Sequence, residues 1–112
     1  SVDEYLWERI IGLLDNNDKW REPNLSLNSL SELLESTRTY VGEAFKQNTG
    51  MTFVEYLNKR RIDYVIAGIK DNPNIDIHEL LNHVGYRQRS TAWRNFQKFT
   101  GMTPTKFVDN LK

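Results

Sequence analysis

Cysteine is absent from this chain of 112 residues. Disulfide bridges, thiolate nucleophiles and zinc sites built on thiolates are therefore excluded, and a reducing compartment agrees with the composition. Long apolar runs are also missing, because no stretch approaches the ~20 residues that a membrane-spanning helix needs. The start of the chain, SVDEYLWERI, is acidic and lacks the pattern of a signal peptide. We expect a cytoplasmic protein.

An initiating methionine is missing as well, since the chain begins with Ser1. We expect an excised part of a longer protein, with a sensor domain or a membrane segment outside this chain. Hydrophobic residues make up 38% and charged residues 27%, which is ordinary for a globular fold. The length suits one compact core. We therefore predict a single domain over residues 1–112.

Acidic charge is missing from one part of the chain, although the net charge at pH 7 is zero. Residues 1–35 carry eight acidic and three basic side chains, a net charge of −5 that the remaining residues balance. No acidic residue occurs from 80 to 106, and YRQRSTAWRNFQKFTG (residues 86–101) contains four bases. Such a segment suggests an anionic partner, whereas the ordinary alternative is a solvated surface.

A repeat of about 50 residues organises the sequence. FKQNTGMTFVEY (residues 45–56) matches FQKFTGMTPTKF (residues 96–107) at an offset of 51. Upstream, Leu30 matches Leu80 at an offset of 50, which implies one extra residue in a turn of the second copy. A duplicated unit predicts two similar supersecondary elements.

Each copy is predicted to be a short helix, a tight turn and a second helix. In the second copy, Asp76 and Glu79 form a capping box before a helix over residues 77–84, and Gly85 suits its left-handed end. The next helix ends before Gly101. Spacings of three and four residues turn three of its side chains toward the core, namely Ala92, Phe96 and Phe99.

The first copy follows the same plan. Ser26 caps a helix over residues 27–34, Thr37 caps the helix that follows, and Gly50 ends that helix. Between the copies, residues 52–71 form a connecting helix of about 18 residues, or roughly 27 Å. It starts with a capping box of Thr52 and Glu55. Its apolar stripe consists of Val54, Leu57, Ile62, Val65, Ile66 and Ile69.

Two further helices lie at the ends of the chain. Residues 1–16 give an amphipathic helix with an apolar stripe, and Thr103 and Pro104 open a short helix that runs through Leu111. No strand pattern occurs. We predict an all-α fold with about seven helices, divided into residues 1–51, the connecting helix 52–71 and residues 72–112. The stripe of the first helix contains Val2, Leu6, Ile10, Leu13 and Leu14.

Two helices that meet at a tight turn form the helix-turn-helix, whose second helix can enter the major groove of DNA. The groove of B-DNA recurs about every 34 Å, so a connecting helix of roughly 27 Å is a suitable spacer between two such units. The sequence therefore predicts sequence-specific binding of double-stranded DNA through two successive major grooves. The acid-free segment would face the phosphates.

Residues 25–111 resemble the DNA-binding domain of the AraC/XylS family of bacterial transcription regulators. The motifs are YLNKRRID on the connecting helix and GYRQRSTAWRNFQKFTGMTPTKF in the second unit. The resemblance implies two helix-turn-helix subdomains joined by a helix, which bind an asymmetric site. It also implies a separate sensor or dimerisation domain, and RNA polymerase is a further candidate partner.

The resemblance places the recognition positions of the second unit at Arg89, Ser90, Trp93 and Arg94. Two hydrogen bonds from Arg94 to a guanine would be worth about 1–3 kcal/mol of discrimination, and a phosphate contact is the alternative. We expect Trp93 to be exposed, against a thymine methyl group or a sugar, since Ala92 and Phe96 take the buried face. The same exposed side carries Gln97, and we expect phosphate contacts from Arg87 and Lys98.

The first unit departs from the family pattern. Its recognition positions hold Thr39, Gly42 and Glu43, so we predict weak base reading there. Glu35 stands where the family favours a glycine in the turn, and Ser31 and Leu81 stand where it prefers alanine. We expect contacts to the DNA backbone from Arg38, Tyr40, Lys46 and Gln47.

Other chemistry has little support. In NKRR (residues 58–61), helical geometry spreads the side chains, and we expect Arg61 to brace the subdomains. His78 and His83 do not share a helix face, so we predict no metal and no other cofactor. No nucleophile has a paired base, so we predict no enzyme and no catalytic residues. The competing function is a helical protein–protein interaction module without DNA binding, in which Trp7 or Trp20 docks a partner.

Overall fold

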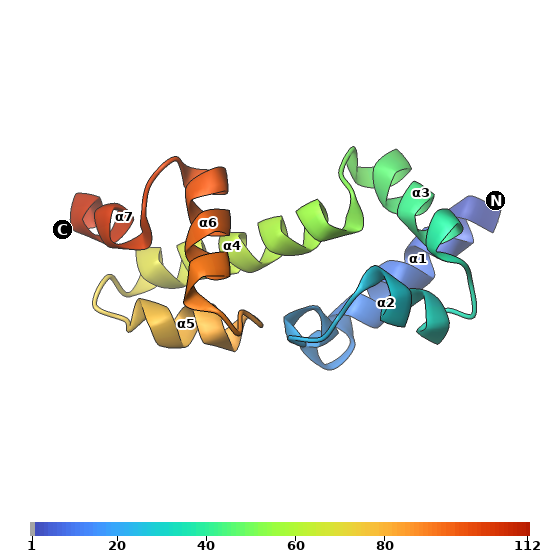
Figure 1. Cartoon of the computed structure of the whole chain (residues 1–112), viewed down its shortest axis with the longest axis horizontal. Helices are drawn as coiled ribbons and strands as arrows, with labels where there is room; N and C mark the ends of the chain where they lie inside the picture. Colours follow the sequence, from blue (N-terminus) through green and yellow to red (C-terminus); the bar gives the residue numbers. More distant parts are fainter. Residues whose placement is uncertain (1) are drawn as a thin grey trace. The chain divides into compact units, whose positions relative to one another are not determined.

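The computed structural model describes the backbone of residues 2–112 and the side chains of residues 4–112 (Figure 1). Ser1 and the side chain of Val2, which belong to the predicted first helix, lie outside these residues. The described part of the chain is all helical and has no strand, as predicted. Its elements are α1 (Val2–Asp15), the 3₁₀ segment η1 (Asn16–Arg21), α2 (Leu27–Leu33), α3 (Arg38–Thr49), α4 (Phe53–Asp71), α5 (Ile77–His83), α6 (Arg89–Thr100) and α7 (Pro104–Leu111).

The chain divides into two compact units, Ser1–Leu57 and Asn58–Lys112. Helix α4 crosses the division. It contributes Phe53 and Leu57 to the core of the first unit and Ile62, Val65 and Ile69 to the core of the second. Each unit contains one predicted pair of short helices, α2 with α3 in the first and α5 with α6 in the second.

Aromatic rings and aliphatic side chains form the core of the first unit. Ile10 of α1 and Phe45 of α3 are fully buried. The Trp7 ring meets the Phe45 ring edge to face, with 5.2 Å between the centroids, and Trp20 is 5% exposed. Tyr56 of α4 lies against the same rings. Trp20 is buried in the core, which excludes the predicted docking role for this residue, whereas Trp7 is half-buried against the core and its docking role stays a prediction.

The segment η1 was not expected from the sequence. Asn17 and Asp18 have φ angles of 53° and 54°, a left-handed conformation that asparagine and aspartate adopt more readily than most residues. This kink ends α1, and it is followed by Trp20, which packs into the core. Arg21 pairs with Asp18 at 3.3 Å across the same turn.

Close packing of α4 against α5 and α6 builds the second core. Ile62, Val65 and Ile69 of α4 and Phe96 of α6 are fully buried. A Cβ atom on Gly68 would come within 2.8 Å of a methyl carbon of the α5 residue Leu80. A larger residue at this position would therefore displace the Leu80 side chain. The Phe107 ring of α7 meets the Phe96 ring edge to face, with 5.5 Å between the centroids.

One residue of the predicted α4 stripe is misplaced. Val54 is 60% exposed, and Phe53 is buried in its place, against the ring of Phe45. The helix begins at Phe53, and Phe53 shares the buried face with Leu57, four residues later. Val54 lies on another face of the helix. The other predicted members are buried, except Ile66, which is half-buried.

The predicted side-chain caps form, although the described structure shows only one half of the predicted capping box of Asp76 and Glu79. Side chains of Ser26, Thr37, Thr52, Asp76 and Thr103 accept hydrogen bonds from backbone N–H groups in the first turns of their helices. Gly50 and Gly101 end α3 and α6 in the left-handed conformation. Local capping chemistry therefore fixes most of the helix ends that position the site.

Candidate nucleic-acid interface

The turns of the two helical pairs differ by one inserted residue. Leu34 and Val84 close the first helices at an offset of 50, whereas Thr37 and Gln88 precede the second helices at an offset of 51. The turn hydrogen bonds keep the smaller offset, since Ser36 N donates to Ser31 O and Tyr86 N donates to Leu81 O. The extra residue of the second unit is therefore Arg87, an exposed base.

Helix α6 has a buried face and a basic exposed face. Ala92 and Phe96 are buried. No acidic residue occurs in its sequence, RSTAWRNFQKFT. The exposed face carries three bases and two further polar side chains: Arg89, Ser90, Arg94, Gln97 and Lys98. The structure therefore brings these predicted site residues onto one helix, with Arg87 in the turn before it.

Trp93 was predicted to be exposed, but in the structure it is only partly exposed. Its ring stacks on the imidazole of His78 from α5, with 6.1 Å between the centroids and 12° between the planes. The side chain is half-buried, and its indole N–H has no hydrogen-bond partner among the residues described. The stack with His78 holds Trp93 against α5, so only part of the ring remains available to a ligand.

A buried polar cluster supports the turn before α6. Tyr86 and Arg61 are each 6% exposed. The Tyr86 hydroxyl donates to Asn58 Oδ1 at 2.7 Å, and the Arg61 guanidinium lies 5.5 Å from the centre of the Tyr86 ring. Burial raises the pKa of Tyr86 to about 12 and lowers the pKa of Arg61 from its ordinary value. This cluster links α4 to the turn that carries Arg87.

Sequence reasoning missed Tyr86 and gave Arg61 a different role. The contact of Arg61 with Tyr86 lies inside the second unit, where it braces the turn. An aromatic residue directly after the turn glycine, Gly85, was the signal that could have found Tyr86. The other bases of the NKRR stretch are also occupied or partly buried, because Lys59 pairs with Asp63 at 2.7 Å and Arg60 is half-buried.

The start of α6 is polar and basic. A cavity of about 180 Å³ opens there, lined among others by His78, Arg87, Gln88 and Arg89. The Gln88 side chain makes no capping hydrogen bond in the described structure. The first N–H groups of α6 thus carry a partial positive charge that the Gln88 side chain does not neutralise. Backbone and side-chain charge at this end of the helix both favour an anion.

Helix α3 presents a mixed surface. Tyr40 is 63% exposed, and a Cβ atom on Gly42 would make an ordinary contact of 3.8 Å with Leu27. The charged residues of the exposed face have both signs, with Glu43 between Arg38 and Lys46 along the helix. The predicted residues of the first unit that share this exposed surface are Arg38, Thr39, Tyr40, Glu43, Lys46 and Gln47.

The opposite charges of the sequence coincide with the two units. Residues 1–57 contain ten acidic and five basic side chains, and residues 58–112 contain five acidic and ten basic ones. The first unit therefore has a net charge of −5 and the second a net charge of +5. An anionic ligand meets attraction in the second unit and repulsion from much of the first.

A family model for a helix-turn-helix domain matches residues 30–110. The chain is 29% identical over 92 residues to the uncharacterized transcriptional regulatory protein YesN of Bacillus subtilis, and this match covers 80% of the chain and 25% of YesN. It is 26% identical over 92 residues to the Msm operon regulatory protein of Streptococcus mutans, with coverage of 80% and 32%. The chain thus spans a third or less of the length of these relatives.

A solved structure has the same fold. The C-terminal domain of AraT, a response regulator from Geobacillus stearothermophilus, superposes with a TM-score of 0.79 at 22% identity, over 98% of this chain and 85% of that one. No helix in the described part of the chain is both long and apolar enough to span a bilayer. Because the family model matches well over half of the residues, this chain belongs to the AraC-type helix-turn-helix family.

Proposed function

We propose that this chain is the DNA-binding domain of a bacterial transcription regulator and that it binds double-stranded DNA in a sequence-specific way. The observation that carries the proposal is the exposed face of α6, which has three bases and no acid over a buried apolar face. In this arrangement α6 enters the major groove, and α3 enters a neighbouring groove.

In the second unit, each exposed side chain takes a distinct role. Arg94 reads a guanine with two hydrogen bonds, because a guanidinium matches the two acceptors of that base in the major groove. Ser90 and Gln97 face the groove on the same side of α6. Arg87 and Lys98 contact phosphates, which sets the position of the helix without reading sequence. Trp93, which leans on His78, offers one ring edge to a sugar or a thymine methyl group.

The first unit contributes mainly through the DNA backbone. Glu43 repels phosphates and disfavours tight approach of α3, unless it accepts a hydrogen bond from a cytosine amino group. Arg38, Tyr40 and Lys46 are exposed and suit phosphate or sugar contacts. Thr39 has a small hydroxyl for either role. We infer weak or permissive base reading by this unit.

The proposed partners follow from this function. The relatives YesN and the Msm operon regulatory protein are named as regulators and are three to four times longer than the matched part. A fused sensor or dimerisation domain outside this chain agrees with that length, and RNA polymerase is a further proposed partner. A cytoplasmic location belongs to the same proposal, because bacterial DNA lies there. We assign the chain no enzymatic activity.

Salt dependence tests the proposal. Binding sites are selected from random duplexes, and the affinity of the chain is measured by fluorescence anisotropy at about 50 and 200 mM salt. With about five neutralised phosphates, log K should fall with log salt at a slope of about −4.5. A flat salt response would contradict DNA binding. A chain that fails to shift random duplexes at low salt would favour the protein-interaction module instead.

A further inference from the structure

The side chain of Trp93 exposes only carbon. Its single polar atom, the indole Nε1, is buried and has no hydrogen-bond partner among the residues described. The side chain is nevertheless only half-buried, so the part of the ring that stays accessible consists of carbon atoms. In this orientation Trp93 contacts a ligand through apolar surface and donates no hydrogen bond to it.

Trp93 borders the predicted reading residues of α6. Arg89 and Gln97 lie four residues before and after it, and Ser90 lies three residues before it. Side chains at these spacings are neighbours on a helix surface, and all three are exposed. A groove of DNA that receives them therefore also meets the carbon surface of Trp93.

The plane of the Trp93 ring is set by His78. The two planes differ by only 12°, and the 6.1 Å between the ring centroids is within the range of offset-stacked rings. His78 belongs to the first turn of α5, where its backbone N–H donates to Asp76 Oδ1 at 3.0 Å. Three residues later Leu81 is 3% exposed and packs α5 into the core. A capped and packed helix thus carries the stacking partner, so the indole is oriented before any ligand arrives.

The matching positions of the first unit hold neither ring. Gly42 matches Trp93 at the offset of the second helices, and Asn28 matches His78 at the offset of the first helices. Asn28 is exposed, as His78 is, but it has no ring that could stack. The indole and the imidazole therefore occur together in the basic unit and are both missing from the acidic one.

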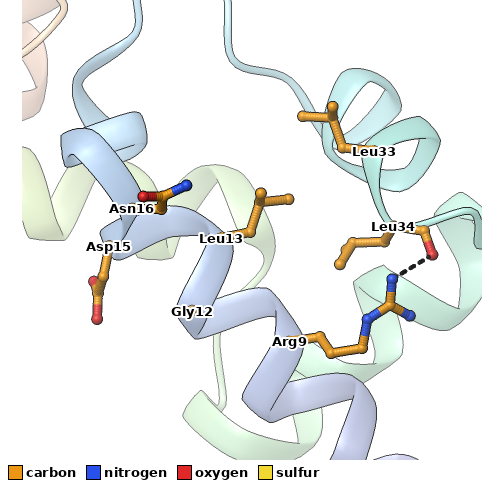
Figure 2. A pocket seen from close by; sticks show the side chains of 7 residues that line it. All are labelled: Arg9, Gly12, Leu13, Asp15, Asn16, Leu33 and Leu34. Carbon is orange, nitrogen blue, oxygen red and sulfur yellow. Dashed lines mark hydrogen bonds between the residues drawn. The ribbon is translucent and has the colours of Figure 1, made fainter.

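Cavities of the two units differ in how their bases are used. Arg9, the one base among the described residues that line a cavity between α1 and α2, donates to the carbonyl oxygen of Leu34 at 3.2 Å (Figure 2). His78 instead lines the cavity at the start of α6 together with Arg87 and Arg89, which are exposed. Positive charge beside the stacked pair attracts an anionic ligand to it.

We propose that His78 is a positioning residue for DNA binding, which holds Trp93 so that the carbon surface of its indole meets an apolar part of the DNA. That part is a thymine methyl group or a deoxyribose. The inference rests on the function proposed above and assigns a role in it to α5, outside the recognition helix. A ring that is already oriented loses less conformational freedom on binding, so His78 strengthens the contact without touching DNA itself.

The orientation of Trp93 is tested first without DNA. The chain has three tryptophans, and the indole N–H signal that Trp93→Phe removes from the NMR spectrum belongs to Trp93. His78→Ala should shift this signal. His83→Ala is the matched control and should leave it in place, because His83 is on the same helix but its ring lies against Tyr64, with 5.9 Å between the centroids. No shift in His78→Ala, or an equal shift in both variants, would overturn the proposal.

A double-mutant cycle then measures the effect on DNA. In anisotropy titrations with the selected duplex, His78→Ala should weaken binding about two- to tenfold, the range that an aromatic pair contributes. The double variant with Trp93→Ala should bind no more weakly than Trp93→Ala alone. His78→Phe keeps a ring for stacking and should restore the affinity to within about twofold of the unmodified chain. Independent losses at the two positions, or no rescue by phenylalanine at an unchanged melting temperature, would contradict the proposal.

Deoxyuridine, which lacks the methyl group of thymine, separates the two apolar parts of DNA. A loss of affinity when one thymine is replaced, absent in Trp93→Ala and reduced in His78→Ala, identifies the methyl group. Coupling of the two residues without such a loss at any thymine identifies the deoxyribose. A loss that persists undiminished in His78→Ala would overturn the positioning role.

Failure of this inference is distinguishable from failure of the proposed function. A chain that binds DNA with a steep salt response but shows no coupling between His78 and Trp93 overturns the inference alone. A chain that binds no duplex at low salt overturns the proposed function and the inference with it.

Discussion

The two units share one backbone plan and differ in surface chemistry. Helices α3 and α6 both have 12 residues, start at an offset of 51 and end at a left-handed glycine. The matched residues on their exposed faces nevertheless differ in kind, with Glu43 opposite Arg94 and Gly42 opposite Trp93. The matched buried positions are apolar in both helices, as with Val41 in α3 and Ala92 in α6. The comparison teaches that the core preserves the helix-turn-helix while its exposed face is free to gain or lose affinity for DNA.

The turns show the same contrast in backbone chemistry. Glu35 has a φ of 52° where the second unit has Gly85 with a φ of 112°. Left-handed geometry costs an ordinary residue about 1–2 kcal/mol, and glycine escapes most of this cost. The first unit therefore keeps its turn against a local penalty. Its second helix gains a cap from Thr37, whereas Gln88 gives α6 no such bond in the described structure.

The largest expected effect lies at the pair of Arg94 and Glu43. Arg94→Ala should weaken binding to the selected site by about 1–3 kcal/mol and relax the preference at one base pair. Glu43→Ala, the matched change in the first unit, should leave the affinity unchanged or raise it, since a repulsive charge is removed. Anisotropy titrations with selected and substituted duplexes measure both. If Arg94→Ala weakens every duplex equally, Arg94 contacts phosphate and reads no base.

The buried tyrosine gives the turn of the second unit a pH dependence, whereas Ser36, the matched residue of the first turn, carries no titratable group. The pKa of Tyr86 is raised in the folded state to about 12. Its contribution to stability is therefore complete below about pH 10 and is lost as the pH rises toward 12, an effect of order 2 kcal/mol. Urea unfolding at pH 9 and about 11.5 should show this loss in the unmodified chain. Tyr86→Phe should flatten the difference, and an unchanged slope would contradict the assignment.

Substitutions in the two turns should change the free energy of unfolding in opposite directions. Gly85→Ala should lower the free energy of unfolding by about 1 kcal/mol or more, because alanine is strained at positive φ. Glu35→Gly should leave it unchanged or raise it by up to about 1 kcal/mol, because the strain of Glu35 is relieved. Thermal and urea unfolding check both. A loss of stability in Glu35→Gly would show that the Glu35 side chain makes a contact worth more than the strain.

The smallest effects concern the helix caps. Thr37→Ala should cost about 1 kcal/mol, because α3 loses the bond from Tyr40 N to Thr37 Oγ1. Gln88→Ser should add up to about 1 kcal/mol, since serine supplies the cap that α6 lacks. Denaturant midpoints at constant slope measure these changes. If both substitutions changed the free energy of unfolding by the same amount and in the same direction, the starts of α3 and α6 would not differ in their capping.

Local signals in the sequence predicted most of the fold, and contacts distant in sequence account for the rest. Ser26, Asp76 and Thr103 fixed helix starts because a cap involves only the next three residues. The stack of Trp93 on His78 and the burial of Tyr86 needed the packing of α5 and α4, which no local pattern contains.

The basic face of α6 was predictable because its charges and buried positions alternate within one helix. The predicted base contacts of Arg94 and Ser90 stay predictions, since exposure alone does not identify a base. The segment η1 was missed because its left-handed residues, Asn17 and Asp18, carry no periodic pattern.

Helix α4 belongs to both hydrophobic cores, through Phe53 and Leu57 at one end and Ile62, Val65 and Ile69 at the other. Helix formation is cooperative, so fraying that starts in one half of α4 spreads into the other. Loss of either core therefore destabilises the other core, because both contain residues of α4. Melting should follow a single transition, and a protease should find no cut within α4 that releases a folded half.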